Sequence, residues 1–133
     1  MADPMQVEVV SATRVVWSGT AVNIIAKTVE GDIGILPGHE PVLAILVPGA
    51  VQIHAEDNKR EIIAVDGGFI SVAHGRVSIL SEYASMAQEV SLRDAEKELA
   101  EAQARLDAGE DDEETRQHFA RASAQVRAAE KMQ

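Results

Sequence analysis

The hydrophobic pattern of this 133-residue chain changes its period once, after Leu80, and that change limits the fold more than any other feature. Residues 6–80 contain short apolar or alternating runs between turn signals, which is typical of strands. Beyond Leu80 glycines become rare, and apolar residues recur every three or four positions, as on an amphipathic helix. We therefore expect two domains, residues 1–88 and residues 89–133.

The first domain is predicted to be an antiparallel β-sandwich, or flattened barrel, of about 8–10 short strands. The clearest strand signals lie at residues 20–28, 43–47 and 50–55, which are rich in β-branched or alternating apolar residues. A two-residue hairpin is expected at His74-Gly75, because glycine permits the tight turn. Ser18-Gly19 is interpreted as a further turn.

The second domain is predicted to be an antiparallel hairpin of two helices. Ser91 can cap the first helix, Ala108-Gly109 can end it, and the acids Asp111–Glu114 favour the positive N-terminal end of the second. The apolar stripes are Leu92, Ala95, Leu99, Ala102 and Leu106 on the first helix and Thr115, Phe119, Ala122, Val126 and Ala129 on the second. Alanine buries little apolar area, so composition allows both a permanently folded hairpin and one that detaches to bind a partner.

Composition and charge narrow the classes of function. The net charge of −10 argues against direct binding to nucleic acid or to an anionic membrane surface. The chain contains no cysteine, which excludes disulfides and thiolate metal sites. Neither a signal peptide nor an apolar run of roughly 18 residues is evident, so we expect a soluble, cytoplasmic protein.

No set of residues converges on catalysis. The histidines are scattered, and the chain has no zinc-binding spacing, no nucleophile elbow and no phosphate-binding Gly-Lys-Ser/Thr loop. We therefore expect a protein that is not an enzyme and holds no metal. The acidic run Asp111–Glu114 is interpreted as a solvated helix start rather than a cation site.

The run 31–41, GDIGILPGHEP, is predicted to be a rigid loop, because glycines and prolines restrict its conformations. Burial of Ile33, Ile35 and Leu36 would push the polar residues outward, and a presented polar rim suits a contact surface. The polar residues are Asp32, His39 and Glu40. Taken alone, the run could also be a structural loop with ordinary turn chemistry.

Together with Trp17-Ser18-Gly19 and Asp66-Gly67-Gly68-Phe69, this run resembles the epsilon subunit of the bacterial F-type, proton-translocating ATP synthase, called delta in mitochondria. The resemblance covers essentially the whole chain from Val7, and only its C-terminal part is generic. It implies a non-catalytic rotor subunit that couples the proton-driven c-ring to the gamma stalk for ATP synthesis. Such a subunit is peripheral on the cytoplasmic face of the cell membrane, which it reaches only through the complex. The rival interpretation is a stand-alone β-sandwich protein-binding module with a helical tail.

The resemblance also implies roles for individual residues. Gly31, Asp32, His39 and Glu40 would face the c-ring, whose basic loops attract the Asp32 carboxylate. In the family the folded hairpin permits rotation, whereas the extended hairpin reaches the catalytic alpha/beta head and impedes ATP hydrolysis. The expected contacts in that extended state are Arg116, Arg121 and Arg127. An equally weighted alternative is that these arginines only balance the acids of their own helix, Glu113, Glu114 and Glu130.

Some bacterial relatives bind ATP through the motif Ile/Leu-Asp-x-x-Arg-Ala on the first helix. Here the matching stretch is 90–95, in which Ser91 replaces the acid and Asp94 replaces the arginine. An aspartate repels the phosphate that an arginine would bind. Arg93 is adjacent to the motif position, and Arg121 on the second helix could still supply positive charge. We therefore expect no cofactor, and the two replacements disfavour ATP as a regulatory ligand.

Overall fold

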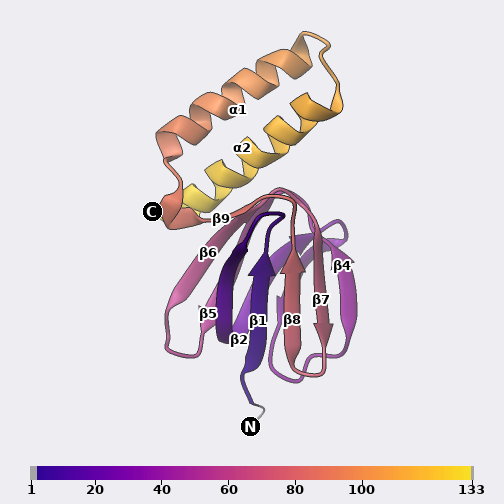
Figure 1. The fold of residues 1–133 in the computed structure, drawn as a ribbon, viewed down its shortest axis with the longest axis vertical. Coiled ribbons are helices and arrows are strands. Elements are labelled where there is room, and N and C mark those ends of the chain that lie inside the picture. Colours follow the sequence, from indigo (N-terminus) through magenta and orange to yellow (C-terminus); the bar gives the residue numbers. More distant parts are fainter. Residues whose placement is uncertain (1–2, 133) are drawn as a thin grey trace.

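The computed structural model of the chain describes residues 3–132 and contains a β-sandwich followed by two helices (Figure 1). The strands are β1 (Met5–Val10), β2 (Val15–Thr28), β3 (Gly31–Ile35), β4 (Val42–Ile45), β5 (Gly49–Ala55), β6 (Arg60–Val65), β7 (Phe69–Ala73), β8 (Arg76–Leu80) and β9 (Ala84–Met86). A 3-10 helix, η1 (Ala87–Glu89), leads into α1 (Leu92–Asp107) and α2 (Glu113–Lys131). The predicted fold class is confirmed.

The two layers of the sandwich are joined by the long strand β2. Its first half pairs with β1, and beyond Ala21 it pairs with β5 and β3. One layer therefore has the order β4-β7-β8-β1-β2, and the other contains β3, β2, β5, β6 and β9. The sheet is not wholly antiparallel as predicted, because β1 and β8 pair in parallel.

An aliphatic core fills the space between the layers. Its largest fully buried side chains include Met5, Ile24, Ile35, Ile53, Ile63, Ile70 and Ile79. In β1 the buried residues Met5, Val7 and Val9 alternate with exposed ones, as expected for a strand with one face on a core. Alternation of this kind is what made the strands recognisable in the sequence.

The structure corrects three local predictions. Gly31–Ile35 is a strand rather than a loop, because its backbone pairs with β2 from Ile24 to Thr28. Leu36, predicted to be buried, is 59% exposed in the turn after β3. Ser18-Gly19 lies within β2 and is not a turn.

The two helices form the predicted hairpin at one end of the sandwich (Figure 1). Ser91 caps α1 as predicted and accepts a hydrogen bond from the Asp94 backbone N–H at 3.3 Å. Asp112 caps α2 in the same way through the Thr115 N–H at 2.8 Å. Helix α2 packs on β5 and β6, whereas α1 packs on α2.

Candidate functional site

Exposed apolar side chains form a row across the outer face of the β4-β7-β8-β1-β2 layer. Pairing places Ile45 opposite Phe69, Phe69 opposite Leu80, Leu80 opposite Val10 and Val10 opposite Val15. Phe69 is 48% exposed, Leu80 50% and Ile45 52%. We call these five residues the cross-strand row. Because neighbouring strands lie about 4.8 Å apart, the row spans roughly 20 Å of sheet.

A shallow groove borders this row. It is lined by Phe69 and Leu80, by the acids Asp66 and Glu82, and by Gln117 of α2. A continuous apolar row with a polar rim is typical of a protein-interaction surface, whereas single exposed apolar residues are ordinary. The sequence signal for the row was weak, because it depends on the register between strands that are distant in the chain.

The residues predicted to meet a ring lie in the edge strand β3 and in the segment that follows it. Gly31 and Asp32 begin β3, and His39 and Glu40 lie in the turn after it. Asp32 and Glu40 are exposed as predicted, whereas His39 is half-buried and its Nδ1 lies 2.6 Å from the Glu40 carbonyl oxygen. A strand rises about 3.3 Å per residue. The length of β3 therefore separates Gly31 and Asp32 from His39 and Glu40, and the four residues do not form one cluster.

Asp32 has an unanticipated neighbour, the C-terminal end of α2. Asp32 lies directly across from Lys27 of β2, and both line a groove that also includes Arg127 and Lys131. The stem of Arg127 crosses β5, because a Cβ added to Gly49 would lie 3.8 Å from Arg127 Cδ. The groove is therefore a mixed-charge contact between the sandwich and the hairpin.

A second hollow lies where α1, α2 and the β9–η1 segment meet. Of the predicted nucleotide residues, Ser91, Asp94 and Arg121 line it, but Arg93 does not. Its other charged lining residues are Glu89, Glu98 and His118, and His118 Nε2 lies 2.6 Å from Glu98 Oε2. Three carboxylates around one arginine make a poor environment for a triphosphate.

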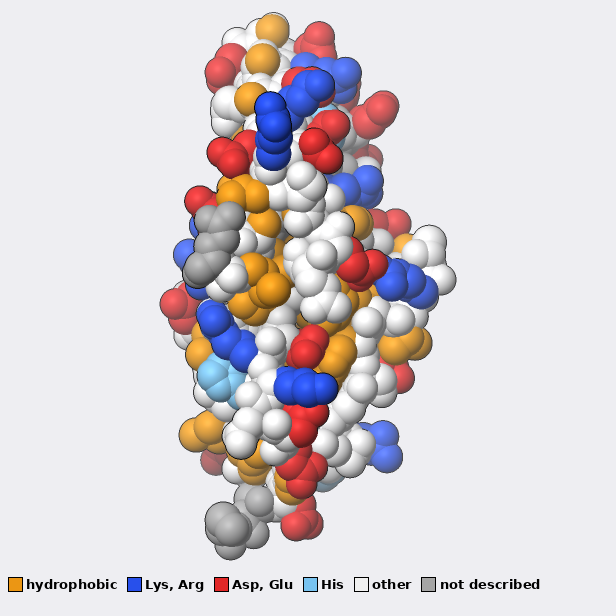
Figure 2. All heavy atoms as spheres, turned by 90° about the vertical axis from the view of Figure 1, so that its left-hand side faces the viewer, with side chains coloured by type: hydrophobic (Ala, Val, Ile, Leu, Met, Phe, Trp, Pro, Cys, Tyr) orange, Lys and Arg blue, Asp and Glu red, His pale blue; other side chains and the backbone are white. Residues whose placement is uncertain are grey.

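The three arginines predicted to contact a catalytic head have different surroundings. Arg116 Nη1 lies 3.2 Å from Asp111 Oδ1 in the segment before α2, and Asp111 is not one of the acids named in the charge-balance alternative. Arg121 instead stacks on the ring of Tyr83, and Arg127 lines the groove beside Asp32. On the face shown in Figure 2, basic and acidic side chains intermingle over the helical end, so no large patch of one sign appears there.

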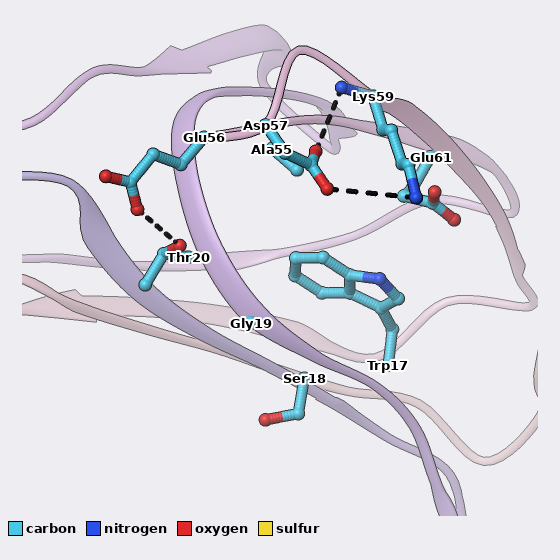
Figure 3. Close-up of a pocket in the computed structure, with 9 residues that line it drawn as sticks. All are labelled: Trp17, Ser18, Gly19, Thr20, Ala55, Glu56, Asp57, Lys59 and Glu61. Carbon is cyan, nitrogen blue, oxygen red and sulfur yellow. Dashed lines mark hydrogen bonds and ion pairs between the residues drawn. The ribbon is translucent and has the colours of Figure 1, made fainter.

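A third hollow lies beside Trp17 at the end of the β5–β6 hairpin (Figure 3). The indole ring lies over Gly19, where an added Cβ would come within 2.9 Å of Trp17 Cη2. Thr20 Oγ1 donates to Glu56 Oε2 at 2.9 Å on the opposite wall. The aromatic ring therefore explains why Trp17 and Gly19 occur together in the sequence.

Within residues 3–132 no group of three or more potential metal ligands comes together. No helix in this part of the chain is long and apolar enough to cross a membrane.

The family model of the ATP synthase delta/epsilon chain, beta-sandwich domain, matches residues 4–87. The chain belongs to this family. The ATP synthase epsilon chain of Cutibacterium acnes is 53% identical over 96 residues, which are 71% of this chain and 66% of that relative. The epsilon chain of Streptomyces avermitilis is 46% identical over 108 residues, or 81% of this chain and 87% of that one.

A solved chain from the Euglena gracilis mitochondrial ATP synthase, in an OSCP/F1/c-ring assembly, shares the fold with a TM-score of 0.77. It is 24% identical, and the match covers 98% of this chain and 82% of that chain. Family membership makes this chain a non-catalytic, central-stalk subunit of the F-type ATP synthase. The resemblance noted in the sequence is thereby confirmed, and the interpretation as a stand-alone binding module is set aside.

Proposed function

We propose that the chain couples the c-ring to the gamma stalk during ATP synthesis and restrains ATP hydrolysis through its C-terminal hairpin. The observation that carries the first part is the cross-strand row. A chain with a net charge of −10 has ample polar surface, yet four apolar residues of the row are exposed on one sheet face, with the half-buried Val10 between them. We assign this face to the gamma stalk, because covering it removes apolar area from water.

The ring contact is assigned to the edge formed by β3. This strand pairs with β2, and Asp32 within it and Glu40 in the segment after it are both exposed. A ring with basic loops would meet Asp32 at one end of the edge and His39 and Glu40 at the other. In this arrangement the subunit lies at the cytoplasmic face of the cell membrane and reaches the membrane only through the complex.

The hairpin is assigned the regulatory role, with residues 1–88 and 89–133 as separate domains. Its buried contacts with β6 are made by the small residues Ala124 and Ala128, which favour a reversible association. Once released, α2 would present Arg116, Arg121 and Arg127 to the alpha/beta head. The acidic hollow that contains Asp94 supports control by the hairpin itself rather than by bound ATP.

Deletion of residues 110–133 tests the regulatory part in the assembled enzyme. We expect ATP hydrolysis to rise and proton-driven synthesis to stay near its normal rate, because the row and the β3 edge are retained. Full-length Arg116→Gln keeps the hairpin and loses one proposed head contact, so it should raise hydrolysis less than the deletion does. Unchanged hydrolysis after the deletion would remove the inhibitory role.

A further inference from the structure

The hairpin is held to the sandwich mainly by small side chains, and two larger ones, Arg127 of α2 and Tyr83 of the sandwich, reach across the contact. Ala124 and Ala128 pack against Ile62 and Ala64 of β6, and Tyr83 packs partly buried beside them. Tyr83 is the single tyrosine of the chain and precedes β9. Because alanine contacts contribute little, a large side chain that touches α2 has a disproportionate effect on docking.

Tyr83 makes two polar contacts with α2. The Gln125 amide Nε2 donates to the Tyr83 hydroxyl at 2.8 Å. The Arg121 guanidinium carbon lies 4.9 Å from the centroid of the ring, within cation–π range. Residues four apart share one face of a helix, so Tyr83 engages two successive turns of α2 at once.

The other end of Tyr83 is fixed to the sandwich. Its backbone N–H donates to Asp66 Oδ1 at 3.1 Å, and its carbonyl oxygen accepts from the Asp66 N–H at 3.2 Å. The buried Ser81 hydroxyl lies 2.9 Å from the same Asp66 oxygen. These bonds hold the backbone of Tyr83 at the β6–β7 corner while its side chain reaches the hairpin.

We propose that Tyr83 is the latch that holds the hairpin in its folded position, with Arg121 and Gln125 of α2 as its partners. Tyr83 is thus a positioning residue, which sets how often α2 leaves the sandwich. The inference deepens the proposed function, on which its biological meaning rests. It also gives Arg121 two roles: its guanidinium is occupied by the Tyr83 ring when the hairpin is folded and becomes free when the hairpin is released.

Hydrogen exchange on the isolated full-length subunit tests the latch, because exchange reports even rare opening of α2. Tyr83→Phe removes the hydroxyl and keeps the ring, so interior amides of α2 should exchange about 2- to 12-fold faster, the range for one net hydrogen bond. Arg121→Gln should make the same amides exchange about 2- to 5-fold faster, as expected for loss of an exposed cation–π contact. Arg116→Gln, which alters an arginine paired with Asp111, should leave α2 exchange unchanged.

A double variant sharpens the assignment. Gln125→Met keeps the side-chain length and removes the donor, so it should match Tyr83→Phe, and combining the two should add nothing further. Unchanged α2 exchange in both Tyr83→Phe and Tyr83→Leu would overturn the latch. Equal acceleration in β5 and β6 would also overturn it, because Tyr83 would then support the sandwich instead.

The assembled enzyme separates this inference from the proposed function. If both hold, Tyr83→Phe should lower ATP hydrolysis, because the extended hairpin is populated more often. If deletion of residues 110–133 leaves hydrolysis unchanged while Tyr83→Phe still accelerates α2 exchange, the latch stands and the inhibitory role fails. If the deletion raises hydrolysis but no Tyr83 variant changes α2 exchange, the inhibitory role stands and the latch fails.

Discussion

Replacing Phe69 by serine should weaken binding to the gamma stalk by about an order of magnitude. Phe69 lies within the cross-strand row, between Ile45 and Leu80, and 48% of it is exposed. Full burial of such a side chain is worth about 1.5–3 kcal/mol, so covering the exposed half contributes roughly 0.8–1.5 kcal/mol. That free energy corresponds to a dissociation constant about 4- to 12-fold larger.

Titration calorimetry of the isolated subunit with its gamma partner measures this change directly. Val22→Ser is the matched control, because Val22 is 41% exposed and lies outside the row. Ile45→Ser should weaken binding by a similar factor, and the effects of the two row variants should not add, since their side chains adjoin. An unchanged dissociation constant for both row variants would refute the assignment of this face to the stalk.

Three further outcomes are expected. Gly68→Ala should lower the free energy of unfolding in urea by more than about 2 kcal/mol, because Gly68 has a positive φ and an added Cβ would overlap a backbone carbonyl of β8. The control Gly75→Ala also has a positive φ, but its Cβ would enter open space, so the loss should be smaller. Hydrogen bonds from the Thr115 side chain and N–H lower the pKa of Asp112, so its stabilisation of α2 is present above about pH 4 and is lost as the pH falls through the lowered pKa. Circular dichroism should show that the unsubstituted chain loses helicity as the pH falls, and that Asp112→Asn, whose side chain caps without a charge, loses less helicity. Asp32→Arg should weaken proton-driven ATP synthesis and leave the isolated fold intact, and normal synthesis would contradict the ring contact.

Features set by local pattern were predictable from the sequence. Alternation marked most strands, the cap of α1 followed from Ser91, and the start of α2 followed from the acidic run Asp111–Glu114. The run 31–41 was recognised as significant but was wrongly taken as a loop throughout. Its glycines suggested turn chemistry, whereas backbone pairing with β2 made the first five residues a strand. Tertiary pairing overrode local propensity in that segment.

Features set by contacts between distant segments were not predictable. The parallel pairing of β1 with β8 joins segments about seventy residues apart, and the cross-strand row depends on it. On α2 the predicted stripe contains Ala122 and Ala129, which are buried, but it omits Ala124 and Ala128. Those two residues form a second buried face that packs on β6, and only the position of the sandwich defines it. Tyr83 was missed for the same reason.

Under the proposed function, the arrangement of surfaces would let the subunit stay attached to the stalk while its hairpin moves. The cross-strand row crosses β4, β7, β8, β1 and β2, whereas α2 packs on β5 and β6 of the other layer. Release of α2 would therefore leave the pairings that build the row intact and would remove only Gln117 from the groove that borders it. The aliphatic core between the layers holds the row in register. A hairpin joined mainly by alanines, with Tyr83 and Arg127 as its larger contacts, can therefore open at a free-energy cost that the core does not share.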